Sequence, residues 1–266
     1  MASILEIEEH ALAGWPAAEI EVFAGWQLRA MSGVSQRANS VWTARAEGAL
    51  TLEGRIEHAE TFYRARSLTA SFQISTQCEP AGLDAALAER GYSIESPVSV
   101  QVARVRDLST AGPSANVRAR VEPHMSDSWF DISGRRGRFA SVQDVYRGLL
   151  SRLGARALYG IAFVDDCPAA VGLGVRGARW LGISSMFTLP EYRGRGAARS
   201  ILRALAAHAD QREEPSLYLQ VERANPAALD LYSQVGFVHH HDYHYRVRAE
   251  TRSPPQTPGI RRAWSA

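Results

Sequence analysis

The chain has 266 residues, of which 45% are hydrophobic and 22% charged, and its formal net charge is +2. This is an ordinary globular composition, long enough for one large domain or two small ones, and it excludes a disordered or fibrous chain. The near balance of charge argues against a nucleic-acid partner. All 30 basic residues are arginines, which excludes Schiff-base chemistry, pyridoxal phosphate anchoring and the P-loop lysine.

The two cysteines, Cys78 and Cys167, lie far apart and not in CxxC spacing. Neither a disulfide framework nor a zinc site is expected, which indicates a reducing, cytoplasmic location. The first ten residues are acidic and no apolar run reaches about 18 residues, so we expect no signal peptide and no membrane partner. Residues 249–266 are rich in Pro, Ser, Thr and Arg, which is typical of a disordered tail.

Helices and strands alternate along the first half of the chain. In chain order, the predicted elements are a helix at residues 4–13, strands at 22–30 and 37–42 joined as a hairpin, a helix at 52–63, a strand at 71–75, a helix at 80–90 and a strand at 98–105. Gly112 and Pro113 indicate a linker after them.

The second half repeats this order with additional elements before it. The predicted elements are a strand at residues 117–121, helical material at 126–153, an antiparallel meander of strands at 157–164, 169–175 and 179–188, a helix at 196–209, a strand at 217–221, a helix at 226–235 and a strand ending near 247. A turn over residues 165–168 joins the first two strands of the meander. The order predicts a mixed α+β fold.

Two short segments indicate an internal duplication. Residues 79–85 read Glu-Pro-Ala-Gly-Leu-Asp-Ala and residues 225–231 read Asn-Pro-Ala-Ala-Leu-Asp-Leu, and each segment precedes a glycine-aromatic pair, Gly91-Tyr92 or Gly236-Phe237. Similar elements surround both segments, which favours two repeats. The predicted domains are residues 1–107 and 117–248, with a linker at 108–116 and a tail at 249–266.

The most informative stretch runs from Met186 to Ala198, where a strand breaks at a proline into a glycine-spaced turn that opens a long helix. Gly194 and Gly196 let backbone NH groups approach a ligand closely. The start of the helix adds unpaired NH groups and the positive end of its dipole. The segment therefore predicts an anion site, best suited to a pyrophosphate.

About thirty residues later, residues 225–237 read Asn-Pro-Ala-Ala-Leu-Asp-Leu-Tyr-Ser-Gln-Val-Gly-Phe. Together with Arg193-x-x-Gly196-x-Ala198, this segment resembles the GNAT superfamily of N-acetyltransferases. The superfamily signature is R/Q-x-x-G-x-G/A after a strand, followed by N-x-x-A-x-x-L-Y-x-x-x-G-F. The resemblance covers residues 115–248, and the whole chain is similar to bacterial tandem-GNAT proteins with a degenerate first copy.

The resemblance implies an α+β fold of two GNAT-like repeats on a mixed α/β sheet, the second repeat complete, with acetyl-CoA bound between two diverging strands. Backbone groups of Met186 and Thr188 would bind the pantetheine arm, and Phe187 would point the other way. Asn225 would bind pantetheine or cap its helix. Backbone NH groups of one loop would wrap the pyrophosphate: Arg193, Gly194, Arg195, Gly196, Ala197, Ala198 and Arg199.

The resemblance also makes Tyr232 the general acid that protonates the leaving thiolate. An alkyl ammonium, with a pKa of roughly 10, cannot attack a thioester until a base or a desolvating pocket removes a proton. The carbonyl oxygen then gains negative charge, which the backbone NH near Met186 is placed to stabilise. Direct transfer is expected, because neither Cys78 nor Cys167 has a histidine nearby in the sequence.

The general base is where the chain departs from a common pattern, because Leu219-Gln220-Val221 replaces the L-E-V of many relatives. Glu222 is the first candidate, since strand alternation places it on the same face as Gln220; the alternative is a solvated surface charge. The second pool is His239, His240, His241 and His244. Alternation leaves no three of these histidines on one face, so no metal site is predicted.

The first repeat lacks the matching residues, with Glu79 or Pro80 at the position of Asn225 and Ala86 or Leu87 at that of Tyr232. One active site per chain is therefore expected. The first repeat would then cover the acceptor cleft with a recognition surface. Its members would be Trp26, Arg29, Arg37, Asn39 and Trp42; the alternative is that the tryptophans are core and the arginines a solvated rim.

The leading hypothesis is an acetyl-CoA-dependent N-acetyltransferase that acts on the primary amine of a small molecule or peptide, as a monomer or homodimer. The alternative is a non-catalytic acyl-CoA-binding sensor or regulatory module, which the missing L-E-V glutamate favours and Tyr232 disfavours. Both hypotheses predict coenzyme A binding, and only the first predicts thiol release in the presence of an amine. Nucleotide binding is disfavoured, because there is no lysine and no Rossmann-type first unit.

Overall fold

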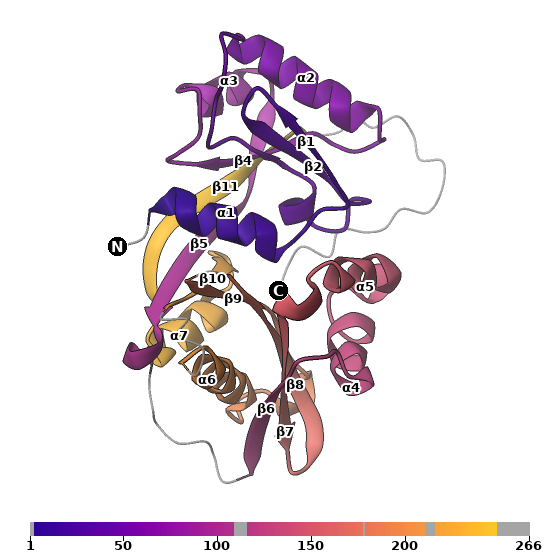
Figure 1. Ribbon diagram of the computed structural model, residues 1–266, viewed down its shortest axis with the longest axis vertical. Helices are drawn as coiled ribbons and strands as arrows, with labels where there is room; N and C mark the ends of the chain where they lie inside the picture. Colours follow the sequence, from indigo (N-terminus) through magenta and orange to yellow (C-terminus); the bar gives the residue numbers. More distant parts are fainter. Residues whose placement is uncertain (1–2, 109–115, 178, 211–215, 249–266) are drawn as a thin grey trace.

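A computed structural model describes residues 3–108, 116–177, 179–210 and 216–248. Its strands form one mixed sheet in the order β1-β2-β3-β4-β11-β5-β10-β9-β8-β7-β6, with helices on both of its faces (Figure 1). The predicted mixed α+β fold is confirmed. The predicted tail and residues 109–115 of the predicted linker lie outside the described residues.

The first half of the chain follows the predicted order with three corrections. Its elements are α1 (Ile4–Gly14), β1 (Glu19–Phe23), β2 (Trp26–Ala30), a 3-10 turn (Gln36–Ala38), β3 (Val41–Trp42), α2 (Leu52–Arg64), β4 (Ser71–Ser75), α3 (Leu83–Glu89), β5 (Tyr92–Arg104) and a second 3-10 turn (Val105–Asp107). The predicted single strand over residues 22–30 is wrong, because Ala24 and Gly25 have positive φ and form the turn of a hairpin. The predicted strand over residues 37–42 is reduced to residues 41–42, because its first part belongs to a 3-10 turn. The β5 strand begins at Tyr92 rather than at residue 98.

The second half contains the predicted meander and the helices after it. Its elements are β6 (Val117–Glu122), α4 (Asp127–Phe130), a π-helical turn (Asp131–Arg135), a 3-10 turn (Ala140–Val142), α5 (Gln143–Ser151), another 3-10 turn (Gly154–Arg156), β7 (Ala157–Val164), β8 (Cys167–Arg176), β9 (Trp180–Thr188), a 3-10 turn (Pro190–Tyr192), α6 (Ala197–Asp210), β10 (Ser216–Glu222), α7 (Pro226–Val235) and β11 (Val238–Arg248). The predicted turn at residues 165–168 is shorter, because Cys167 already begins β8.

Each half contributes its last strand to the other half. The β11 strand pairs antiparallel with β4 of the first half, and β5 pairs antiparallel with β10 of the second. The two strands also pair with each other at the centre of the sheet, and β11 is the yellow strand that reaches from the lower half to the upper half (Figure 1). Because of this exchange, the predicted domain boundaries stay a prediction.

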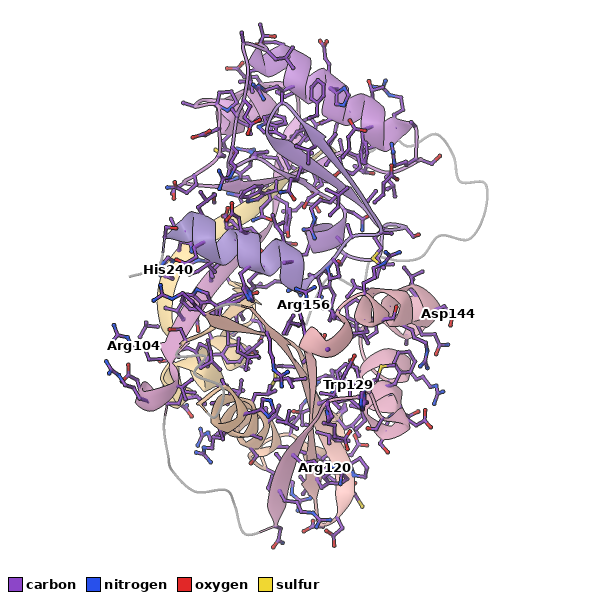
Figure 2. The ribbon with its side chains drawn as sticks, in the orientation of Figure 1. Arg104, Arg120, Trp129, Asp144, Arg156 and His240 are labelled. Atoms are coloured by element: carbon purple, nitrogen blue, oxygen red, sulfur yellow. The ribbon has the colours of Figure 1, made fainter. Side chains whose placement is uncertain are left out.

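Buried apolar residues fill both faces of the sheet. One cluster lies beneath α6 and α7 and includes Ile201 and Tyr232, and a second gathers residues of α4, α5 and the opposite strand faces around Trp129. Helix α1 covers the centre, where Ile7 packs with Val98 and Val100. Arg156 donates a hydrogen bond to Ala13 O (3.2 Å) and so connects α1 to the second half (Figure 2).

Among the described residues, no helix is both long enough and apolar enough to span a membrane.

Candidate functional site

The central feature of the site is a gap that opens between β9 and β10. The two strands pair in parallel only from Trp180 with Ser216 to Ile183 with Leu219. Beyond that point β9 continues along β8, while β10 continues along β5. A register shift in the β8–β9 pairing lies beside Ser185, whose φ is +50°. The two strands therefore diverge where they leave their common pairing.

Backbone groups of β9 face this gap. Leu189 N donates to Ala169 O (2.9 Å), which turns the backbone of Leu189 toward β8. Backbone hydrogen-bonding groups alternate along a strand, so those of Met186 and Thr188 point away from β8 and toward the gap. The side chains of Met186 and Phe187 separate in the way predicted, since Met186 packs with the cluster beneath α6 and Phe187 with the cluster beneath α5.

The glycine-spaced loop leads from the end of β9 into α6. Gly194 and Gly196 have φ values of +74° and +89°, a conformation that costs glycine little and most other residues more. Ala197 is buried at the helix start and Ala198 is half-buried. The two glycines thus place the chain ahead of the first turn of a helix of 14 residues, whose NH groups and dipole attract an anion.

The arginines of this loop already have partners in the protein. Arg193 Nε donates to Thr188 O (3.4 Å), Arg195 forms an ion pair with Asp165 (2.5 Å), and Arg199 donates to Gln234 Oε1 (2.6 Å). These contacts hold the side chains against neighbouring elements. An anion at the loop would therefore be bound mainly by backbone NH groups, as the motif predicts.

Helix α7 carries the other two motif residues on the α6 side of the sheet. Asn225 caps the helix, because its Oδ1 accepts a hydrogen bond from Ala228 N (3.1 Å). Tyr232 lies in the cluster beneath α6 and α7, with its ring edge-to-face against Phe237 at 5.9 Å. Burial raises the pKa of Tyr232 to about 12, so its phenol remains protonated at neutral pH.

Gln220 and Glu222 lie on the opposite face of the sheet from Leu219 and Val221, which belong to the cluster of Tyr232. Gln220 Oε1 accepts hydrogen bonds from Arg37 (3.4 Å) and from the Tyr243 hydroxyl (3.2 Å). Glu222 is half-buried at the end of β10. The buried phenol of Tyr232 and the carboxylate of Glu222 thus lie on opposite faces of the sheet.

The histidines of β11 have other contacts. His239 contacts Asp242 (3.1 Å) and His244 contacts Asp84 (3.0 Å). His241 is buried beside Glu8 (3.8 Å), and its pKa is lowered to about 4 by burial. A β-bulge at His240 breaks the strict alternation expected for this strand, and no group of three metal-ligating side chains occurs among the described residues.

The predicted recognition surface is mostly interior. Trp26 and Trp42 are buried, which confirms the interpretation that they are core. Asn39 bonds backbone atoms of Met31, Gly33 and Ser35. The interpretation of Arg29 as a solvated rim residue is wrong, because it is buried and donates to the carbonyls of Leu12, Trp15 and Arg37.

Arg37 alone of these residues reaches the face of Gln220. It lies over the Trp15 ring at 4.6 Å and lines a small cavity together with Trp15, Ser184 and Gln220. Two of its neighbours, Arg138 from the segment between α4 and α5 and Tyr146 from α5, belong to no motif and have no signal in the sequence. Tyr146 is hydrogen-bonded to Ser133 and Ser185 (2.9 Å each), so it connects α5 to the π-helical turn and to the shifted part of β9.

Comparison with known proteins gives consistent matches over nearly the whole chain. A family model described as "Probable histone acetyltransferase Rv0428c C-terminal" matches residues 1–246. The uncharacterized N-acetyltransferase YobR of Bacillus subtilis is 31% identical over 93% of this chain and 100% of its own length.

Solved structures match the same span. A GCN5-related N-acetyltransferase from Kribbella flavida superposes with a TM-score of 0.69 at 15% identity, over 93% of this chain and 96% of its own. A tandem GNAT protein from the clavulanic acid biosynthesis pathway superposes with a TM-score of 0.64 at 12% identity, over 93% and 89%. At these identities the superpositions show a common fold.

Proposed function

Because this chain belongs to the family of the Rv0428c C-terminal region and has the fold of GNAT N-acetyltransferases, we propose that it transfers the acetyl group of acetyl-CoA directly to a primary amine. The observation that carries the proposal is the open gap between β9 and β10, next to a glycine-spaced loop at the start of α6. The gap offers backbone groups to a pantetheine arm and the helix start offers NH groups to a pyrophosphate.

The acetyl donor enters from the α6 side. Met186 and Thr188 bind the pantetheine arm through their backbone, and the loop from Arg193 to Arg199 binds the pyrophosphate. Asn225 acts mainly as the cap of α7, since its side-chain oxygen already accepts the Ala228 NH. These assignments require no rearrangement of the arginine side chains described above.

The amine approaches from the face of Glu222 and loses its proton there. Glu222 is the general base of the proposal, because Gln220 cannot accept a proton. Of the β11 histidines, His239 and His244 contact other carboxylates, His241 is buried, and the half-buried His240 contacts the His241 ring (2.8 Å). The attack moves negative charge onto the thioester oxygen, where backbone NH groups near Met186 stabilise it. The attack forms the carbon–nitrogen bond. Collapse of the intermediate restores the carbonyl and breaks the carbon–sulfur bond, and the proton that the nitrogen then loses passes to the departing sulfur.

Tyr232 assists the departure of sulfur. Its phenol, with a pKa raised to about 12, is a hydrogen-bond donor throughout the neutral range. A thiol has a pKa of about 8.5, so complete proton transfer to the thiolate from so weak an acid is uphill. Tyr232 therefore stabilises the leaving thiolate by hydrogen bonding and keeps its own proton.

We infer one such site per chain. The order β3-β4-β11-β5-β10-β9 reads symmetrically about the β11–β5 pair, and both β3–β4 and β9–β10 are parallel. This arrangement supports two repeats of one ancestral unit. The first repeat lacks counterparts of Tyr232 and of the glycine-spaced loop.

The test is calorimetric titration of acetyl-CoA into the wild-type protein and a Gly196→Glu variant. Gly196→Ala is the matched control, because it introduces the same backbone strain at φ +89° without the carboxylate. Micromolar binding to wild type, retained in the alanine variant and lost in the glutamate variant, supports the donor site. Absence of binding to the folded wild type contradicts it.

Thiol release from acetyl-CoA with a library of primary amines then tests catalysis. Turnover of any amine supports the transferase. Binding of acetyl-CoA without turnover across the library would instead favour the acyl-CoA-binding module, which the replacement of the L-E-V glutamate by Gln220 already suggests.

A further inference from the structure

Two arginines from distant parts of the chain meet on the acceptor face. Arg37 comes from the 3-10 turn before β3, and Arg138 comes from the segment between α4 and α5. Neither forms an ion pair with a carboxylate among the described residues, whereas Arg135 and Arg136 of the same segment pair with Asp131 (3.4 Å) and Glu191 (2.9 Å). Arg37 and Arg138 are therefore two cations without an anionic partner in the described part of the chain.

An aromatic platform holds both guanidinium groups in place. Arg37 lies 4.6 Å from the Trp15 ring, and Arg138 lies 4.8 Å from the Phe139 ring. The Trp15 and Phe139 rings are themselves 5.9 Å apart, and Tyr146 stacks on Phe139 at 4.1 Å. Such cation–π contacts fix the direction of a guanidinium while leaving its NH donors available.

Arg138 is an exposed residue that has titratable neighbours from other elements. Its side chain reaches solvent, yet desolvation by surrounding protein and, to a smaller extent, the nearby Arg37 charge lower its pKa to about 10. Glu222, Tyr146 and Tyr245 are also close enough to influence its charge. Arg138 thus stands near the proposed general base as well as near Arg37.

Two like charges held together without an anion are unfavourable, and an anion between them relieves the repulsion. Planar guanidinium groups bind oxyanions through paired hydrogen bonds. Arg37 already touches Gln220, whose neighbour on the same face is Glu222, roughly 7 Å further along β10. The face therefore presents a carboxylate to an ammonium group and two arginines to an oxyanion.

This inference rests on the proposed function. We propose that the acceptor is an amine that also carries an oxyanion. Arg37 and Arg138 bind the oxyanion of the acceptor, and the amino group of the acceptor faces Glu222. A free amino acid is the simplest molecule of this class, and a phosphorylated amine presents the same charges. A lysine in a cationic peptide fits poorly, because two unpaired arginines repel a neighbouring positive charge.

The test compares acceptors that differ only in the anion. Thiol release from acetyl-CoA is measured with L-amino acids against their C-terminal amides, with phosphoethanolamine against ethanolamine, and with a lysine-rich peptide. We expect kcat/KM to favour the members with an oxyanion about ten- to hundredfold, the size of one or two charge-assisted hydrogen bonds. The two pairs distinguish a carboxylate from a phosphate.

Variants assign that preference to the two arginines. Arg138→Gln or Arg37→Gln should reduce it to about threefold or less, while Arg135→Gln, an exposed arginine of the same segment, should preserve it. Because each variant is compared on the same acceptor pair, the difference in basicity between an amino acid and its amide cancels. Equal kcat/KM within pairs, or preference for the lysine-rich peptide, overturns the proposal and leaves the transferase standing.

A binding measurement keeps the two proposals apart if no acceptor reacts. N-acetyl-L-amino acids and their amides are titrated calorimetrically into the wild-type protein and Arg138→Gln. Binding of the carboxylates alone, weakened about tenfold or more by Arg138→Gln, supports the oxyanion site even if the transferase fails. Equal binding of both kinds of ligand, or binding of neither, overturns it.

Discussion

The two halves of the chain use the same order of strands and helices around the centre of the sheet. They differ in the loop that leads into the helix between two parallel strands, which is α2 in the first half and α6 in the second. In the second half, β9 leads through two glycines with positive φ into α6. In the first half, β3 leads into α2, whose N-terminus is capped by the Thr51 side chain, an acceptor for Gly54 N (3.2 Å). Capping satisfies an NH group that an anion would otherwise bind.

Arg55 makes further contacts at the start of α2 in the first half of the chain. It is a buried residue of α2, and its guanidinium donates to the carbonyls of Leu50 (3.3 Å) and Glu47 (2.7 Å). The start of α2 is thus occupied by the protein's own side chains, whereas the start of α6 is open. The proposed ligand site is therefore placed at the start of α6 and not at the start of α2.

The largest expected effect separates Tyr232 on α7 from Leu87 on α3, which is one of the two residues predicted to match it in the first repeat. Tyr232→Phe should lower kcat about a hundredfold or more, because the leaving thiolate loses its hydrogen-bond donor, with little change in Tm. Leu87 is fully buried, so Leu87→Ala should cost roughly 2–5 kcal/mol of stability and leave kcat unchanged while the protein is folded. Steady-state kinetics and urea denaturation measure both. Wild-type kcat in Tyr232→Phe would remove Tyr232 from the mechanism.

A smaller effect concerns the junction of the halves, where His241 of β11 is buried beside Glu8 of α1. Burial lowers the pKa of His241 from 6.5 to about 4. Between these values the unfolded chain binds a proton that the folded chain does not, so His241 makes stability fall with acidification, by at most roughly 1.4 kcal/mol per pH unit. Burial raises the pKa of Glu8, which acts in the opposite direction.

Variants of the two residues separate the contribution of His241 to the pH dependence of stability from that of Glu8. Urea denaturation at pH 6.5 and 4.5 should show a smaller acid loss of stability in His241→Gln than in wild type. Glu8→Gln should show a larger one, because the opposing contribution is gone. Parallel pH profiles for all three proteins would contradict the assignment.

The smallest expected effect is on the cysteines. Cys78 is half-buried, and burial raises the pKa of its thiol, which lowers the thiolate fraction. Cys167 is exposed at the start of β8. The double variant Cys78→Ser/Cys167→Ser should keep kcat within about twofold, because direct transfer needs no acetyl-cysteine. A large loss of kcat would replace direct transfer by a two-step route.

Most of the individual elements could be predicted because their signals are local. The β7, β9, α6 and α7 elements follow from apolar periodicity and from caps, and they appear close to the predicted positions. The hairpin turn at Ala24-Gly25 was missed because a positive φ at alanine has no sequence signal. The exchange of β5 and β11 was missed for another reason, since strand partners depend on contacts between distant segments.

The amino-acid sequence was enough to infer the mixed α+β class, the two motifs and the order of loops, helices and strands. Each of these depends on residues that are neighbours in the chain. Long-range packing was needed to end the β9–β10 pairing at Ile183, to bury Arg29, and to bring Arg37 and Arg138 together. These features arise where segments far apart in the chain pack against each other. A guanidinium has the same local pattern whether it binds carbonyls, lies in a solvated rim or binds an anion; only its surroundings distinguish the three.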